Sequence, residues 1–390
     1  MCKFTQTDVK DGEFRMNPAY NHDRLEGCKL ISLLHIGTMP WKAVAALLLV
    51  LCLCDSSRTE DLNLTQRFLL LSTLRISTLE REVRAATGSG YRLLFASSAG
   101  SGSEVGGGLP QAFTERNQLI LEKTSSGPES IDYLFLKSRG QSPADSAAFL
   151  ESDMNEAVAR GYRFVPRTVL GLMEKRATDN SSPSLRYRIL AGSSEHLQEE
   201  ICKASSAGFQ FLDLVDNVVV MEKSSVSSET AGNTANTQTG RGAGCLYLVI
   251  GTRTEGALRK EIAAGAANGY RVVSASCPGE IMVVMEKAAD SGSREYLILD
   301  SMRVGKLERD IKEGAGRGFH AVPRAFIAYS ITNVAILEKS SSMTAMYEYT
   351  LLQAQKSATL QKKLSNAAEQ GFRPVAMNGS RIMLLEKTRP

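Results

Sequence analysis

One short pattern recurs six times along this chain of 390 residues and constrains its fold more than any other feature. Each copy contains a glycine followed by an aromatic residue and, further on, an apolar run that closes with Glu-Lys. The glycine pairs are Gly90-Tyr91, Gly161-Tyr162, Gly208-Phe209, Gly269-Tyr270, Gly318-Phe319 and Gly371-Phe372. The closing pairs are Glu122-Lys123, Glu174-Lys175, Glu222-Lys223, Glu286-Lys287, Glu338-Lys339 and Glu386-Lys387. A pattern that returns about every fifty residues predicts a chain of repeated modules.

The residues before each glycine predict a helix. Apolar residues stand eleven and seven positions before the glycine and a small residue four positions before it, so they share one helical face. In the fourth copy these residues are Leu258, Ile262 and Gly265. Glycine enters the left-handed conformation without a Cβ penalty, and we therefore expect each glycine to end its helix. The small residue is expected to let the last turn lie close to a sheet.

Strand-like runs stand on both sides of each predicted helix. First strands are predicted at Phe68–Leu71, Tyr133–Leu136, Tyr187–Leu190, Tyr247–Ile250, Tyr296–Leu299 and Tyr349–Leu352. Two more strands follow each glycine, most simply as a hairpin. The predicted fold class is α+β, with six tandem β-α-β-β modules that each have an antiparallel three-stranded sheet and one helix. Such a module buries too little alone, so we expect the modules to pack as pairs or as an array.

The modules are numbered 1 to 6 and are predicted at residues 65–123, 131–175, 185–223, 245–287, 294–339 and 346–387. Residues 224–244 are rich in Ser, Thr, Asn and Gly without an apolar period, which predicts a flexible linker. This linker divides the modules into two blocks of three. Pro166-Arg167 and Pro323-Arg324 occur in the middle module of each block and indicate duplication of a triplet.

Residues 39–57 resemble a secretory signal peptide. Lys42 precedes an apolar run from Ala43 to Cys54, and polar residues follow. In a helix this run spans about 18 Å, too short for a hydrocarbon core of about 30 Å. We therefore expect translation from Met39, a non-native or disordered extension at 1–38, and export to the periplasm or the extracellular space. A buried apolar helix is the alternative, and Cys52 and Cys54 leave a lipid anchor open.

Three cysteines follow the leader, Cys202, Cys245 and Cys277. Their odd number, without a Cys-x-x-Cys pair, predicts neither a disulfide framework nor a zinc site. Cys202 falls in a predicted helix and is expected to be a small buried apolar residue. Cys245 and Cys277 flank module 4 and could pair in an exported protein.

The sixth module carries a family resemblance. It runs from Tyr347-Glu-Tyr349 through Leu364-Ser-Asn-Ala-Ala-Glu-Gln-Gly371-Phe372-Arg-Pro-Val375 to Glu386-Lys387. This pattern resembles the bacterial domain of unknown function 4177, and the resemblance covers six segments between about Thr65 and Lys387. The family has no established activity, so the resemblance implies the fold of each module and no function.

Few residues point to chemistry. We expect His196 and His320 to be solvated rather than catalytic or metal-binding, and Gly100–Gly102 and Gly314–Gly318 to be loop or capping glycines. No catalytic residue, metal or cofactor is predicted. The tyrosines that open the first strands are expected to pack at a core or an edge rather than to stack on bases.

An arginine after the aromatic residue recurs in four modules, as Arg92, Arg163, Arg271 and Arg373. Aligned on a shared scaffold, this Arg stripe is a candidate binding site for phosphates or acidic glycans. The alternative, which we favour, is a solvated strand position or a pairing with the recurrent glutamate of Glu-Lys.

The charge balance bears on the partner. The chain has 46 basic and 42 acidic residues, a net charge of +4, which provides no global field for nucleic acid or an anionic membrane. The leading hypothesis is an exported, non-enzymatic repeat protein that acts as a binding scaffold for a protein or an envelope polymer. Membrane contact is expected only through an amino-terminal anchor. The alternatives are a polyanion- or nucleic-acid-binding protein that uses the Arg stripe, and an envelope enzyme with a site between modules.

Overall fold

The computed structural model describes residues 66–73, 76–98, 117–125, 131–136, 143–168, 171–177, 185–215, 217–224, 245–277, 279–289, 292–329, 332–341, 345–378 and 382–389. The chain divides into two units, Met1–Leu62 and Asn63–Pro390, and every described residue belongs to the second. The predicted extension, signal peptide and lipid-anchor cysteines lie outside the described residues, as do most of the predicted linker and Gly100–Gly102.

The first three modules have the predicted order of elements. Module 1 contains β1 (Phe68–Thr73), α2 (Ile76–Gly88), β2 (Tyr91–Ser98) and β3 (Asn117–Lys123). Module 2 contains β4 (Ile131–Phe135), α3 (Pro143–Ala159), β5 (Arg163–Phe164) and β6 (Leu172–Arg176). Module 3 contains β7 (Leu185–Ala191), α4 (Ser194–Ser206), β8 (Gln210–Val215) and β9 (Val218–Ser224).

The last three modules repeat this order. Module 4 contains β10 (Tyr247–Thr252), α6 (Glu255–Ala267), β11 (Tyr270–Ser276) and β12 (Ile281–Lys287). Module 5 contains β13 (Arg294–Ser301), α7 (Val304–Gly316), β14 (His320–Tyr329) and β15 (Thr332–Ser340). Module 6 contains β16 (Tyr347–Gln353), α8 (Ser357–Glu369), β17 (Arg373–Met377) and β18 (Ile382–Thr388). The predicted α+β fold of six β-α-β-β modules is confirmed.

In each antiparallel sheet the third strand lies between the first and the second, as in the order β10-β12-β11. The glutamate of Glu-Lys therefore has a partner on both sides. In module 4, Glu286 stands opposite Tyr247 on the first strand and Arg271 on the second. In five of the six sheets the pairing of the second strand contains a bulge, for example between Phe211 and Asp213 in module 3.

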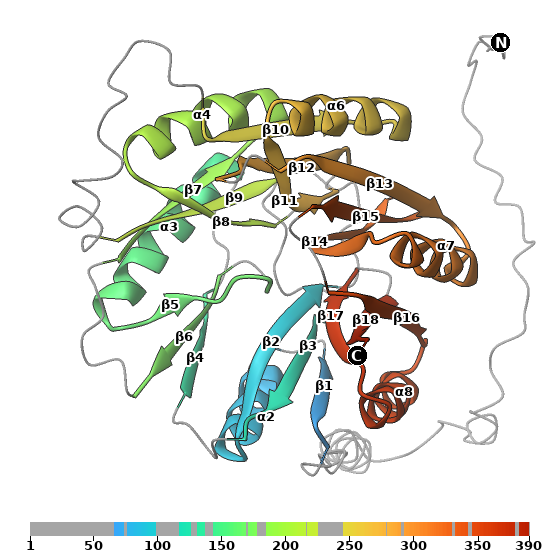
Figure 1. Ribbon diagram of the computed structural model, residues 1–390. Helices are drawn as coiled ribbons and strands as arrows, with labels where there is room; N and C mark the ends of the chain where they lie inside the picture. The colour runs from blue at the N-terminus through green and yellow to red at the C-terminus, as the bar shows by residue number, and fades with distance from the viewer. Residues whose placement is uncertain are drawn as a thin grey trace, which may run out of the picture. The chain divides into compact units, whose positions relative to one another are not determined.

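The modules of the unit Asn63–Pro390 form a closed ring (Figure 1). Each helix packs against the first strand of the next module, in the pairs α2–β4, α3–β7, α4–β10, α6–β13, α7–β16 and α8–β1. The last pair joins module 6 to module 1. The helices lie on the outside of the ring, and the second strands, among them β11, β14 and β17, lie nearest its centre. The expected array thus closes on itself, which leaves no terminal module to cap.

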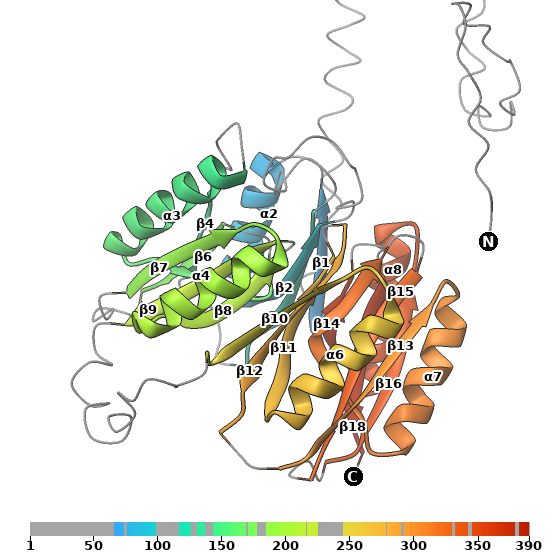
Figure 2. The ribbon, with the colours of Figure 1, turned by 90° about the horizontal axis from the view of Figure 1, so that it is seen from above.

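Each helix is shared between two sheets, as the view in Figure 2 also shows. Helix α4 buries Leu197 and Ile201 in one core with Val219 of its own module and Val284 of module 4. The third strands are consequently buried on both faces, which explains their continuous apolar runs, such as Ile281–Met285. Sharing the helices supplies the apolar cover that a single module lacks.

In every module the lysine of the Glu-Lys pair contacts the aromatic residue of the Gly-aromatic pair. All six glycines have φ between 78° and 89°, which confirms the predicted left-handed helix ends. The lysine lies over the aromatic ring, with Nζ between 4.9 and 5.9 Å from the ring centre. In module 3, Lys223 Nζ also donates to the carbonyl of Ala207 at the end of α4, at 2.8 Å. The lysine therefore holds the helix end against the sheet.

Candidate functional site

The recurrent tyrosines join neighbouring modules. At five contacts the tyrosine hydroxyl accepts a hydrogen bond from the backbone N–H that stands three positions after the glycine of the preceding module. These bonds are Leu93 N to Tyr133 (3.1 Å), Phe164 N to Tyr187 (2.9 Å), Phe211 N to Tyr247 (3.0 Å), Val272 N to Tyr296 (2.9 Å) and Ala321 N to Tyr349 (3.0 Å). Burial raises the pKa of Tyr187 and Tyr349 above the usual range. Tyr187, Tyr247 and Tyr349 are buried, in agreement with the predicted packing at a core or an edge.

A helix side chain covers the outer edge of the next module's first strand. Gln198 on α4 accepts from Val249 N at 2.7 Å and donates to the carbonyl of Tyr247 at 3.1 Å. Gln361 on α8 binds Leu70 N and the carbonyl of Phe68 in module 1 in the same way, at 2.6 and 3.0 Å. Edge groups that would otherwise attract another strand are thus occupied.

The Arg stripe lies among the recurrent glutamates. Arg271 and Arg373 form ion pairs with Glu286 and Glu386, at 3.3 and 2.7 Å. The hydrogen bond to Glu386 raises the pKa of Arg373. The other two members occupy the same register, with Arg92 opposite Glu122 and Arg163 opposite Glu174. Pairing with the recurrent glutamate thus occurs in modules 4 and 6, and polyanion binding by the stripe stays a prediction.

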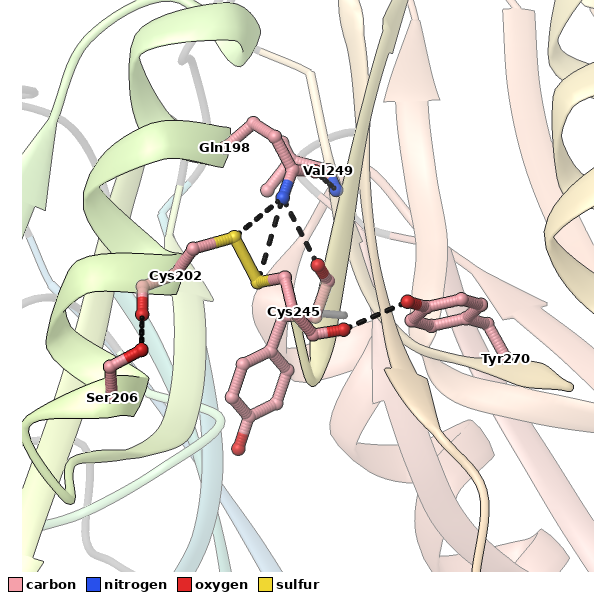
Figure 3. The surroundings of a disulfide bond; sticks show 7 residues. Gln198, Cys202, Ser206, Cys245, Val249 and Tyr270 are labelled. Carbon is pink, nitrogen blue, oxygen red and sulfur yellow. Dashed lines mark hydrogen bonds between the residues drawn. A yellow bond between two sulfur atoms is a disulfide. The ribbon is translucent and has the colours of Figure 1, made fainter. Parts of the chain in front are cut away.

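A disulfide joins Cys202 of α4 to Cys245, just before β10, across the boundary between the two blocks (Figure 3). Gln198 lies over it, with Nε2 3.0 Å from Cys202 Sγ. Two predictions were therefore wrong. Cys202 forms a disulfide rather than standing as a buried apolar residue, and Cys245 pairs with Cys202 rather than with the half-buried Cys277. The contact between α4 and β10 decides the pairing, because it places a helix of one module beside the first strand of the next.

The two histidines differ in exposure. His196 is exposed near the start of α4, as predicted. His320 is only 6% exposed and packs edge-on against Tyr347, with 5.1 Å between ring centres, so its predicted solvation was wrong. Burial lowers its pKa, although Glu386 and Glu338 oppose the shift. The shorter imidazole stays beneath Tyr347 at a position where Arg271 and Arg373 extend to the surface.

A cavity of about 180 Å³, here called the central cavity, lies among the second strands. All six modules contribute to its lining, for example through Phe95, Thr168, Leu214, Ser274, Phe326 and Met377. Residues of one type recur in register at the module contacts, whereas the lining residues differ from module to module, apart from Arg167 and Arg324 at equivalent positions of modules 2 and 5. The central cavity is therefore the candidate functional site.

Two arginines and one aspartate supply the charge of the central cavity. Asp213, which is almost fully buried, accepts from Arg167 N at 2.5 Å and from Leu214 N at 2.9 Å. Arg324 Nη1 lies 3.8 Å from Asp213 Oδ1 and donates to the carbonyl of Leu212 at 2.5 Å. Arg167 donates through Nη2 to the carbonyl of Val375. These contacts link modules 2, 3, 5 and 6.

The environment perturbs these charges. Burial raises the pKa of Asp213, opposed by the nearby Arg324. Burial also lowers the pKa of Arg167, and the charge of Arg324 adds to that effect. Arg167 has a φ of 64°, the one positive value among the described non-glycine residues. Such backbone conformations cost free energy and concentrate at functional sites.

The sequence prediction placed the candidate site on the Arg stripe and missed Arg167, Asp213 and Arg324. The sequence does contain a signal for the two arginines, because Pro166-Arg167 and Pro323-Arg324 stand at the same distance after their glycines. It was interpreted only as evidence of duplication. No signal marked Asp213, whose module has no counterpart of these Pro-Arg pairs.

Among the described residues, no group of three potential ligands is placed to hold a metal ion. No described helix combines the length and the apolarity needed to cross a membrane. The chain matches no protein-family model and no curated protein. Membership of the bacterial domain of unknown function 4177 stays a prediction.

Proposed function

We propose that this chain is an exported, non-enzymatic repeat protein whose ring acts as a binding scaffold for a protein or an envelope polymer. One observation carries the proposal. Tyrosine, lysine and glutamate recur at equivalent positions, where they hold modules or helix ends in place, as in the bond from Val272 N to Tyr296. Side chains that differ between modules gather instead at the centre of the ring, as expected if binding depends on the differences.

A catalytic role for this site has less support. Neither His196 nor His320 lines the central cavity. Asp213 is already engaged by two backbone N–H groups, so its carboxylate is not placed as a free general base. These contacts favour binding over the alternative of an envelope enzyme with a site between modules.

Export is supported by the disulfide, because such bonds persist mainly in oxidising compartments. The signal-like residues 39–57 point the same way. We expect the exported protein to begin between Cys52 and Thr59 when its amino-terminal sequence is determined. Recovery of an intact Met1 terminus from the cytosol would contradict export.

The scaffold is tested by affinity capture from the native envelope fraction with the mature chain, followed by titration of the captured partner. We expect one partner that binds saturably and is recovered chemically unchanged. The control is Leu258→Asp, which places a charge at a fully buried core position and disrupts the ring. Equal retention by this control, or release of an altered partner, would reject a binding scaffold.

A further inference from the structure

The two cavity arginines occupy equivalent positions in the ring. Arg167 of module 2 and Arg324 of module 5 each stand six positions after the helix-ending glycine, and their modules are three apart. Each donates to the carbonyl of a bulge residue, Arg167 to Val375 of module 6 and Arg324 to Leu212 of module 3. The acceptor modules are also three apart. The centre of the ring therefore has approximate two-fold symmetry.

Asp213 breaks this symmetry. It stands next to the bulge residue of module 3, where it lies beside Arg324. The corresponding residue next to Val375 in module 6 is Ala376, which has no charge. In the part of the chain that the structure describes, no carboxylate lies within ion-pair distance of the Arg167 guanidinium. One half of the centre thus has an acid and the other half lacks it.

The resulting charge is compensated only in part, because Asp213 and the more distant Glu386 act on Arg167 while Arg324 and Arg373 oppose them. Two guanidinium groups and one carboxylate leave a net positive charge at a cavity that is also lined by Phe95, Phe326 and Ile327. The Phe95 ring lies 5.6 Å from the Arg167 guanidinium and offsets only part of that charge. A charge in such surroundings is costly without an opposite charge.

We propose that the central cavity binds a small carboxylate, which takes the place beside Arg167 that Asp213 takes beside Arg324. A carboxylate matches the planar donors of a guanidinium, and one negative charge balances the excess. A volume of about 180 Å³ accommodates a carboxylate of a few heavy atoms. Ala376 is the residue that leaves room for it.

The test is thermal unfolding of the full chain with sodium acetate as the probe, titrated against sodium chloride at constant ionic strength. We expect a saturable rise in the unfolding midpoint, because a ligand of the folded state stabilises it. Ala376→Asp supplies the missing carboxylate within the chain and should abolish the rise. Arg271→Gln, a change on the Arg stripe away from the cavity, should leave the rise intact.

A second variant covers the case in which Ala376→Asp does not fold. Asp213→Asn keeps the shape and removes the internal competitor for the arginines, so acetate should bind about tenfold more tightly or better. Three results would overturn the proposal. Acetate could fail to raise the unfolding midpoint of the wild-type chain saturably, or it could raise the midpoint of whichever variant folds by the same amount as in the wild type. Inorganic phosphate could also raise the wild-type midpoint more than acetate does. None of these results would contradict the proposed scaffold function, because the scaffold's partner is captured without acetate.

Discussion

The hydroxyl of Tyr296 accepts a hydrogen bond from Val272 N at 2.9 Å, across the contact between modules 5 and 4. The same hydroxyl donates to Glu338 at 2.5 Å, so one side chain links two modules and the recurrent glutamate. At four further contacts between modules a backbone N–H donates to a tyrosine hydroxyl in the same way. The contact that closes the ring does not, because Phe68 stands in place of the tyrosine and Pro374 has no N–H to donate.

Removal of the hydroxyl should weaken a module contact. We expect Tyr296→Phe to lower the free energy of unfolding by about 1–3 kcal/mol, because Val272 N–H loses its acceptor in a partly buried place. Denaturant titration measures the change. An unaltered unfolding free energy would mean that this bond does not hold the ring.

The closing contact offers a matched control. Phe68→Tyr alone should bring no gain, since Pro374 cannot donate. Phe68→Tyr combined with Pro374→Ala should be more stable than the two single changes predict, by about 0.5–1.5 kcal/mol. Strict additivity of the two changes would contradict the proposed equivalence of this contact with the other five.

Two glycines of α7 should respond oppositely to alanine. A Cβ at Gly314 would lie 3.0 Å from both Leu297 Cδ2 and Leu337 Cδ2, so Gly314→Ala should destabilise the protein by about 1–3 kcal/mol. A Cβ at Gly316 would meet nothing within 4 Å, and Gly316→Ala should stabilise it by up to about 1 kcal/mol. Thermal unfolding of both variants is the measurement, and a shift of the same sign in both would refute the close packing of the helix end.

The disulfide should stabilise the junction of the two blocks. Cys202→Ser should lower the free energy of unfolding by about 2–4 kcal/mol, since the bond closes a long loop between Cys202 and Cys245. Reductant should have the same effect on the wild-type chain and none on the variant. Cys277→Ser, a change at a cysteine outside this disulfide, is the control. Peptide mapping that links Cys245 to Cys277 instead would disprove the assignment.

His320 should make stability depend on pH. Burial lowers its pKa, so below the unfolded value of about 6.5 the unfolded chain binds the proton more readily. The free energy of unfolding should therefore fall as pH decreases from about 7 to about 5.5. His320→Gln, the residue that module 3 has as Gln210, should reduce that dependence. Parallel pH curves for the two proteins would show that His320 is not the group responsible.

The repeated parts of the fold were predictable because their causes are local. The apolar spacing of Leu258 and Ile262 and the left-handed Gly269 each depend on a few neighbouring residues. Closure of the ring was not predictable, since it depends on the angle between successive modules. The contact of α8 with β1 joins residues at opposite ends of the described chain, and no local pattern encodes it.

The candidate site could not be predicted from the sequence, for a related reason. Arg167, Asp213 and Arg324 belong to three modules and meet at the centre because the modules form a ring. Bulges in the second strands of modules 5 and 3 lie at Arg324 and beside Asp213. The sequence pattern singled out residues that recur in several modules, such as Arg271, and Arg271 pairs with Glu286 of its own module. In a repeat protein the binding residues are to be sought where the repeats disagree.

The Arg stripe provides the last prediction. We expect no measurable binding of the wild-type chain to DNA or heparin at physiological salt, because Arg271 and Arg373 are already paired with glutamates and the net charge is only +4. Filter binding and heparin chromatography across a salt series measure this directly. The matched variant changes Arg92, Arg163, Arg271 and Arg373 to Gln together. Salt-sensitive binding of the wild-type chain, with a log–log salt slope that falls by up to about four units in the variant, would instead favour a polyanion-binding protein, since each lost phosphate contact removes about one unit.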